Sequence, residues 1–160
     1  MIDSLEFARE GGRLEGDAPV GVFPRLTDVL VDDKGSTQSS LHWELAGEQG
    51  GGRYYLTLRL QGNLNLRCQR CLETVVWPVD LKSRLLLVPP GEEWPDDELM
   101  DDRSDAIEAT KALALLPLVE EEVLLALPIA PRHKDCRPPT ALDEHEPSPF
   151  AVLAKLRKGV

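Results

Sequence analysis

Two long runs of alternating apolar and polar residues lie on either side of a short cysteine motif, and they constrain the fold more than any other feature. The first run extends from Tyr54 to Cys68 and the second from Leu72 to Val88. A period of two is typical of a strand that buries one face. The segment Cys68-Gln69-Arg70-Cys71 between them is short enough for a hairpin, so we predict two long antiparallel strands.

Gly62 and Pro78 interrupt these runs. A glycine permits a kink in one long strand, whereas a hairpin at Gly62-Asn63 would divide the first run in two. Pro78 lacks the N–H that a sheet ladder requires, so it indicates an edge position or a bulge in the second run. We expect one kinked strand in the first run and keep the hairpin as the alternative.

Weaker patterns add shorter elements to this hairpin. Residues 41–46 alternate like a strand, and residues 105–109 have the composition of a short one. Residues 113–127 follow the helical period, with Glu120–Glu122 on the polar face and Pro128 beyond the end. Mixed strand and helix patterns of this kind predict the α+β class, with helices packed on one side of a long antiparallel hairpin sheet.

The two ends of the chain carry less pattern. Residues 1–40 are poorly defined, because glycine and proline interrupt the helical stretches near Ser4–Glu10 and 21–31. At the other end, residues 148–156 resemble a capped helix that is too short to be stable without a docking surface. We expect this helix to contact a partner through three apolar side chains, Phe150, Leu153 and Leu156.

The length of 160 residues predicts one domain. Within residues 1–160 we expect an acidic loop at 91–104 and an extended tail at 132–160. The longest uncharged apolar stretch, 123–131, has nine residues and two prolines, whereas a membrane helix needs about 20. The N-terminus has neither the basic nor the apolar region of a signal peptide. We therefore predict a cytoplasmic protein without a membrane partner.

The charge of the chain is concentrated in a few segments. Lys and Arg number 18 against 28 Asp and Glu, for a net charge of −10. Residues 91–122 hold twelve acids and two bases, whereas residues 53–84 carry a net charge of +4 and residues 132–160 a net charge of +2. This distribution excludes a uniformly basic nucleic-acid coat. The acidic run is either a solvated loop or a surface that repels nucleic acid while the basic hairpin faces it.

The cysteines indicate a metal site. Cys68-x-x-Cys71 has the spacing of a zinc knuckle, in which two thiolates at a hairpin tip hold one metal ion. A structural zinc normally has four ligands, and His133 and Cys136 are the candidates for the other two. We predict a structural zinc that pins the hairpin tip to the His133–Cys136 loop. The alternative is that Cys68 continues the apolar face of its strand and that the other two cysteines are plain thiols.

Catalysis is not predicted. A redox C-x-x-C usually begins a helix, whose dipole lowers the pKa of the first thiol, but here strand patterns flank the motif. A small thiol protein therefore stays the less favoured alternative. The sequence has no nucleophile elbow, phosphate-binding loop, metalloprotease motif or dinucleotide-binding motif. His42 lies on the polar face of its strand, as expected for a surface residue rather than a general base.

Three blocks of the sequence, taken together, resemble a known family. They read LRCQRCLE at 66–73, EEEVLLALPIAPRH at 120–133 and PFAVLAKL at 149–156. This order resembles the YceD family, the large ribosomal RNA subunit accumulation proteins of bacteria and plastids. The resemblance implies a non-enzymatic role in the maturation or accumulation of large-subunit ribosomal RNA. Some members carry a second cysteine pair late in the chain, which suggests zinc, whereas this chain has Cys136 with His133 nearby.

The charge pattern is compatible with that role in two ways. Arginine suits phosphate contacts because its planar guanidinium presents several donors. The candidate RNA-binding residues are Arg59, Arg67, Arg70, Lys82 and Arg84. Alternatively, the acidic residues 91–122 bind a basic ribosomal protein and the chain never touches RNA. In both cases the expected partner is a pre-ribosomal large-subunit particle, with no small-molecule substrate.

Overall fold

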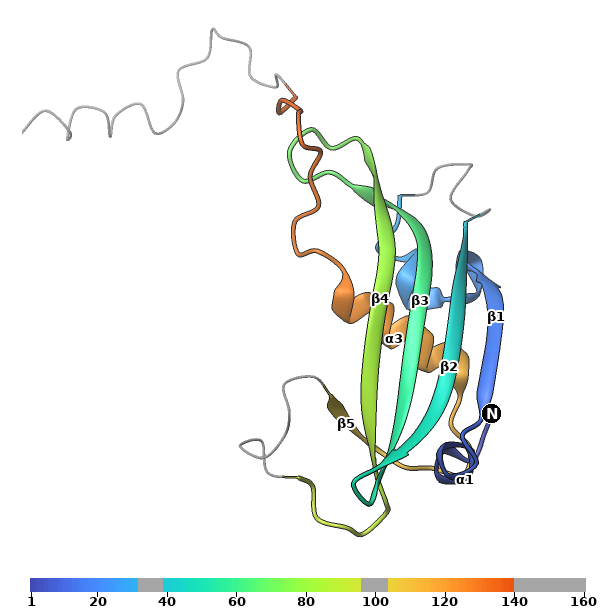
Figure 1. The fold of residues 1–160 in the computed structure, drawn as a ribbon. Coiled ribbons are helices and arrows are strands. Elements are labelled where there is room, and N and C mark those ends of the chain that lie inside the picture. Colours follow the sequence, from blue (N-terminus) through green and yellow to red (C-terminus); the bar gives the residue numbers. More distant parts are fainter. Residues whose placement is uncertain (32–38, 96–103, 140–160) are drawn as a thin grey trace, which may run out of the picture.

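The computed structural model describes residues 1–31, 39–95 and 104–139, and a five-stranded sheet forms its centre (Figure 1). The strands lie in chain order: β1 Arg13–Pro19, β2 Ser40–Gly50, β3 Arg53–Arg67, β4 Thr74–Val88 and β5 Asp105–Glu108. The first four are antiparallel to their neighbours, whereas β5 is parallel to β4. The α+β class is confirmed, but the sheet is mixed rather than purely antiparallel.

The long hairpin of β3 and β4 forms as predicted. β3 continues through Gly62, which pairs with Val79, so the alternative hairpin at this glycine is wrong. A Cβ atom at Gly62 would lie 2.7 Å from Leu41 Cδ2, so the glycine permits the close approach of β2. Pro78 pairs with Asn63 in a part of β4 beyond the reach of β5, which pairs with residues 85–88. Within the described chain, Pro78 therefore lies on a strand edge, where a missing donor is tolerated.

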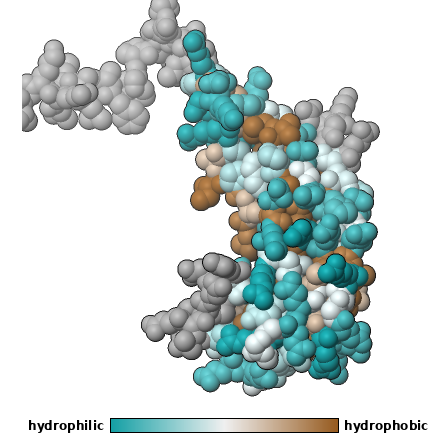
Figure 2. Space-filling view, in the orientation of Figure 1, coloured by the Kyte–Doolittle hydropathy of each residue, from teal (hydrophilic) through white to brown (hydrophobic). Residues whose placement is uncertain are grey.

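The hydrophobic core lies between one face of the sheet and three helices, α1 Ser4–Arg9, α2 Pro24–Thr27 and α3 Leu115–Ala126. The buried leucines of β2, β3 and β4 face this side, and they include Leu45, Leu56, Leu58, Leu60, Leu64 and Leu85. Figure 1 shows α3 crossing behind the strands. The opposite face is open, and Figure 2 shows hydrophilic side chains over much of it. The apolar face and the hydrophilic face both follow from the period-two pattern, because alternate side chains of a strand point to opposite faces of the sheet.

Helix α3 matches the predicted segment, but one prediction about its polar face is wrong. Glu120 was expected on the solvent side, yet its side chain is 6% exposed. One carboxylate oxygen accepts hydrogen bonds from the backbone N–H groups of Arg25, at 2.7 Å, and Leu26, at 3.1 Å. These donors lie in the first turn of α2, where N–H groups lack partners within the helix. Glu120 therefore joins α2 to α3 instead of facing water.

The strand β1 and the short 3₁₀ helix η1 Val20–Val22 were not predicted. The sequence RLEGDAP contains a glycine and a proline, which usually interrupt strands. In the fold Gly16 pairs with Trp43, and a Cβ atom at this position would lie 2.9 Å from the indole ring. The glycine that suggests a turn is therefore the place where a tryptophan packs against the backbone.

Two predicted features fall partly or wholly outside the described residues. These are the acidic loop at 91–104, of which residues 96–103 lie outside, and the terminal helix that carries Phe150, Leu153 and Leu156. Of the helices that the structure describes, none is long and apolar enough to cross a membrane.

Candidate metal centre

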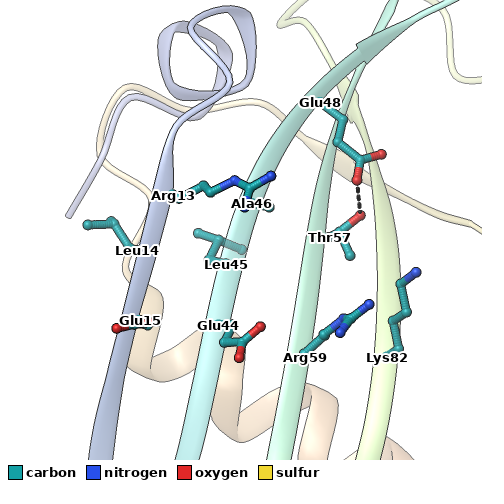
Figure 3. A pocket seen from close by; sticks show the side chains of 10 residues that line it. All are labelled: Arg13, Leu14, Glu15, Glu44, Leu45, Ala46, Glu48, Thr57, Arg59 and Lys82. Carbon is teal, nitrogen blue, oxygen red and sulfur yellow. Dashed lines mark hydrogen bonds between the residues drawn. The ribbon is translucent and has the colours of Figure 1, made fainter.

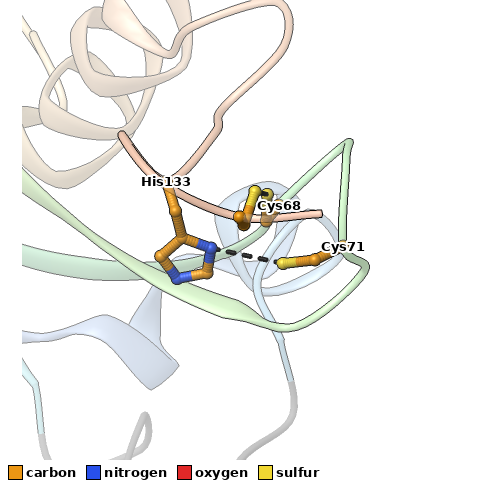
Figure 4. A group of neighbouring side chains, drawn as sticks. Cys68, Cys71 and His133 are labelled. Carbon is orange, nitrogen blue, oxygen red and sulfur yellow. Dashed lines mark hydrogen bonds between the residues drawn. The ribbon is translucent and has the colours of Figure 1, made fainter. Parts of the chain in front are cut away.

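The tip of the β3–β4 hairpin is a tight turn that holds the C-x-x-C motif. The backbone N–H of Cys68 donates to the carbonyl of Glu73 at 2.8 Å, and the N–H of Leu72 donates to the carbonyl of Cys68 at 3.0 Å. Leu72 has a φ of 65°, in the left-handed region where non-glycine residues are uncommon. This turn places Cys68 and Cys71 beside one another (Figure 4).

Residues 127–139, here called the connector, lead from the end of α3 to this tip (Figure 1). Hydrogen bonds to the hairpin hold the connector there, and two of them come from the turn itself. The backbone N–H of Gln69 donates to the carbonyl of Pro131 at 2.8 Å, and Nη1 of Arg70 donates to the carbonyl of Cys136 at 3.2 Å. The connector thereby places His133 and Cys136 beside the two hairpin cysteines, although more than 60 residues separate them in the sequence.

The four side chains have the geometry of a metal site. One donor atom from each of Cys68, Cys71, His133 and Cys136 lies within 4.8 Å of all the others. Sγ of Cys68 is 3.7 Å from Sγ of Cys136, and Sγ of Cys71 is 3.3 Å from Nδ1 of His133 (Figure 4). Two thiolates bound to one tetrahedral zinc at about 2.3 Å lie about 3.8 Å apart. The separations thus fit a single ion with three sulfur ligands and one nitrogen ligand.

The orientation of His133 supports this arrangement. Its Nε2 lies 3.0 Å from the carbonyl oxygen of Thr74, so Nε2 carries the proton and donates it. In the neutral ring Nδ1 is then the nitrogen with a free lone pair, and it faces Cys71. Metal-bound histidines commonly donate their other ring N–H to a backbone carbonyl, which fixes the tautomer and the ring orientation. His133 therefore has the second hydrogen bond expected of a ligand.

The protonation of the thiols also favours a cation. Burial acts to raise the pKa of Cys68, but the backbone N–H groups of Cys71, Arg70 and His133 outweigh it and lower the pKa to about 5. Cys68 is therefore a thiolate at neutral pH. Burial, together with the hydrogen bonds that the Cys136 thiol donates to Cys68 and Cys71, raises the pKa of Cys136. A metal ion would compensate the charge of the Cys68 thiolate and would displace the proton of Cys136, and because Cys68 is 0% exposed its thiolate is placed to bind a metal rather than to attack a substrate.

The five candidate RNA-binding residues fall into two groups. Arg67 and Arg70 lie at the hairpin tip, next to the candidate ligands Cys68 and Cys71. Arg59, Lys82 and Arg84 lie on the open face of the sheet, where Arg59 and Lys82 are direct partners on β3 and β4. Arg84 lies 3.9 Å from the ring centroid of Tyr55 and 3.8 Å from a carboxylate oxygen of Glu48. The hairpin therefore does not present these five side chains as one surface.

A shallow hollow of about 670 Å³ covers the middle of the sheet (Figure 3). One row across β1 to β4 places two acids beside two bases, in the order Glu15, Glu44, Arg59 and Lys82. His42, also on β2, contacts Asp17 and Glu44 as expected for a surface histidine. Acids and bases thus share the open face in similar numbers along this row.

The structure also places three basic residues at the tip that the sequence analysis did not select. Arg132, Lys134 and Arg137 lie on the connector, directly beside the predicted ligands His133 and Cys136. Their adjacency to these ligands was the available signal. The predicted RNA-binding residues all belong to the hairpin segment, whereas these three residues belong to a distant segment that reaches the tip only in the folded chain.

Comparison with known proteins identifies the family. The sequence model described as large ribosomal RNA subunit accumulation protein YceD matches residues 56–157, which include all four candidate ligands. The protein of that name from Haemophilus influenzae is 26% identical over 113 residues, which span 62% of this chain and 63% of the relative. No solved structure matches the chain. The chain belongs to the YceD family.

Proposed function

We propose that this protein supports the processing or accumulation of large-subunit ribosomal RNA as a non-enzymatic factor that binds a pre-ribosomal particle in the cytoplasm. The name of its Haemophilus relative supports this role, as does the family match over residues 56–157. The partner on the particle is precursor RNA or a ribosomal protein. The single observation that carries the proposal is the family match, which covers the hairpin, helix α3 and the connector.

We further propose that the group holds a structural zinc. The ligands would be the thiolates of Cys68, Cys71 and Cys136 and Nδ1 of His133, a donor set that suits zinc. Bound zinc would supply a cross-link between the hairpin tip and the connector. The chain's own hydrogen bonds, from Gln69 and Arg70 to the connector, already orient the two segments. The resulting knuckle, residues 67–74 with 131–139, would be a rigid surface for the particle.

Co-sedimentation tests the cellular role. Lysate that contains the tagged full chain is separated on a sucrose gradient at low salt, and precursor large subunits are located by their RNA. We expect the protein to be enriched with these precursors. Its recovery only at the top of the gradient would contradict stable binding to the particle.

The metal is tested on purified protein. We expect about one zinc per chain by elemental analysis, and we expect Cys71→Ser to lose the ion and to lower the thermal stability of the zinc-loaded protein. His42→Ala is the matched control, because this histidine lies on the open face away from the knuckle. Metal-free protein, together with an unchanged melting temperature for Cys71→Ser, would reject the zinc site.

A further inference from the structure

Each candidate metal ligand has a basic residue directly beside it in the sequence. Arg67 precedes Cys68 and Arg70 precedes Cys71, while the connector repeats the pattern on the other side of the centre. Because the fold brings the four ligands within 4.8 Å of one another, it also gathers their basic neighbours around one centre. We call these residues the basic rim, and they are Arg67, Arg70, Arg132, Lys134 and Arg137.

The basic rim gives the knuckle a charge opposite to that of the rest of the chain. Residues 67–74 and 131–139 contain the five bases of the rim and two acids, Glu73 and Asp135, for a net charge of +3. One Zn²⁺ with three thiolates would add −1, which leaves +2. The whole chain carries −10, so the remaining residues are strongly acidic. A polyanion would therefore be attracted to the knuckle and repelled by the body of the protein.

The side chains of the rim are accessible to a ligand. Arg67, Arg132, Lys134 and Arg137 are exposed, and Arg70 is partly exposed. In the described part of the chain, no carboxylate forms an ion pair with any of the five. Figure 2 shows hydrophilic side chains gathered at this end of the molecule. The rim thus offers charge that the protein does not neutralise itself.

On the open face of the sheet, unlike in the basic rim, acidic side chains lie close to the basic ones. There Glu15 and Glu44 lie in the same row as Arg59 and Lys82, so a phosphate near the two bases would also lie near the two acids. Arg84 is already held by Glu48 and Tyr55. The knuckle has five bases against two acids, whereas the row on the open face has two bases against two acids.

We propose that the basic rim binds the phosphate backbone of RNA, and that the metal centre aligns its two halves for this contact. The inference deepens the proposed function, on which it rests, by naming RNA as the partner and Arg132, Lys134 and Arg137 as contact residues. Guanidinium and ammonium groups on a rigid knuckle suit phosphate oxygens at several positions along a backbone. Such contacts fix position on RNA without reading its sequence.

The test is binding of the zinc-loaded full chain to protein-free large-subunit ribosomal RNA over a range of salt concentrations. The variant R132Q/K134Q/R137Q removes three rim charges, and R53Q/R59Q/K82Q removes three exposed charges from the sheet as the matched control. We expect the rim variant to bind about tenfold more weakly and the magnitude of its logarithmic salt slope to fall by about 2. The control variant keeps affinity and slope close to those of the unmodified protein. Thermal melting checks that both variants are folded.

Three results would overturn the inference: unchanged RNA affinity of the rim variant, an equal loss in the control variant, or competition by polyglutamate as effective as that by unlabelled RNA. The last result would assign the rim to an acidic protein. Failure of the proposed function is distinguishable from these results. If the unmodified protein binds RNA through the rim but does not co-sediment with precursor subunits, the cellular role is wrong and the RNA site stands.

Discussion

The middle of the sheet and the tip of the hairpin belong to the same two strands but are held together by different interactions. In the middle, leucines of β3 and β4 pack under α3 and exclude water. At the tip, Cys68 is buried, while Leu72 is 53% exposed and Gln69 and Glu73 face solvent. The tip therefore depends on backbone hydrogen bonds and on the four candidate ligand side chains. Apolar burial should keep the middle of the sheet folded without metal, whereas the tip should need the metal to stay ordered.

The largest effect is expected in the middle of the sheet. Leu58 is 1% exposed and pairs with Leu45 on β2. Replacing it by alanine leaves a cavity, so we expect Leu58→Ala to lower the free energy of unfolding by about 2–5 kcal/mol, with or without zinc. Chemical denaturation measures this change. Leu125→Ala, at a helix position that is 77% exposed, is the control and should change stability by less than about 0.5 kcal/mol. Equal effects of the two substitutions would place the core elsewhere.

The second-largest effect, the stabilisation by zinc, should be confined to the tip. Zinc at 100 times its Kd stabilises the state that binds it by about 2.7 kcal/mol, which slows amide exchange in the knuckle. Cys136→Ser removes one ligand, so we expect this zinc dependence to disappear at residues 68–73 while β2 and the middle of β3 keep their protection. Hydrogen exchange with and without zinc tests this expectation. Loss of protection throughout the sheet would show that tip and middle unfold together.

The main features of both regions could be predicted from the sequence. The strands of the hairpin follow from a local pattern, because alternate residues of a strand must face opposite sides of the sheet. The candidate ligand set followed from counting: C-x-x-C supplies two ligands, and His133 and Cys136 were the remaining sulfur and nitrogen donors with suitable spacing. Each inference needed only residue types and spacing, without any knowledge of which distant segments touch.

The features that escaped prediction depend on contacts between distant segments. From the sequence alone Gly16 suggests a turn, because its contact with Trp43 is not visible there. Likewise Glu120 looks like one member of a charged run, because its contact with the first turn of α2 is not visible there. The basic residues of the connector escaped for the same reason, since they lie at the tip only after α3 has returned the chain along the sheet. A local sequence pattern does not show which distant segments come into contact in the fold.

Glu120 allows the third test, of a polar contact within the apolar layer. Removing its carboxylate would leave two N–H groups of α2 without an acceptor, so we expect Glu120→Ala to cost about 1–3 kcal/mol of stability. The adjacent Glu121→Ala is the matched control, because this side chain is exposed and should contribute little. Thermal or chemical denaturation compares the two variants. A similar cost for both would mean that helix charge, rather than the contact with α2, determines the effect.

The smallest effect is expected from the strained turn at the tip. Leu72 adopts a φ of 65°, which costs an ordinary residue roughly 1–2 kcal/mol and costs glycine little. Part of this gain is offset by the greater freedom of glycine in the open state, so we expect Leu72→Gly to stabilise the tip by about 1 kcal/mol. If the turn closes when metal binds, zinc affinity should rise about fivefold, which competition with a chelator would measure. Leu72→Ala removes most of the side chain but keeps the strain, so its affinity should stay near that of the unmodified protein. An equal rise in both variants would trace the effect to the exposed leucine side chain and not to the backbone.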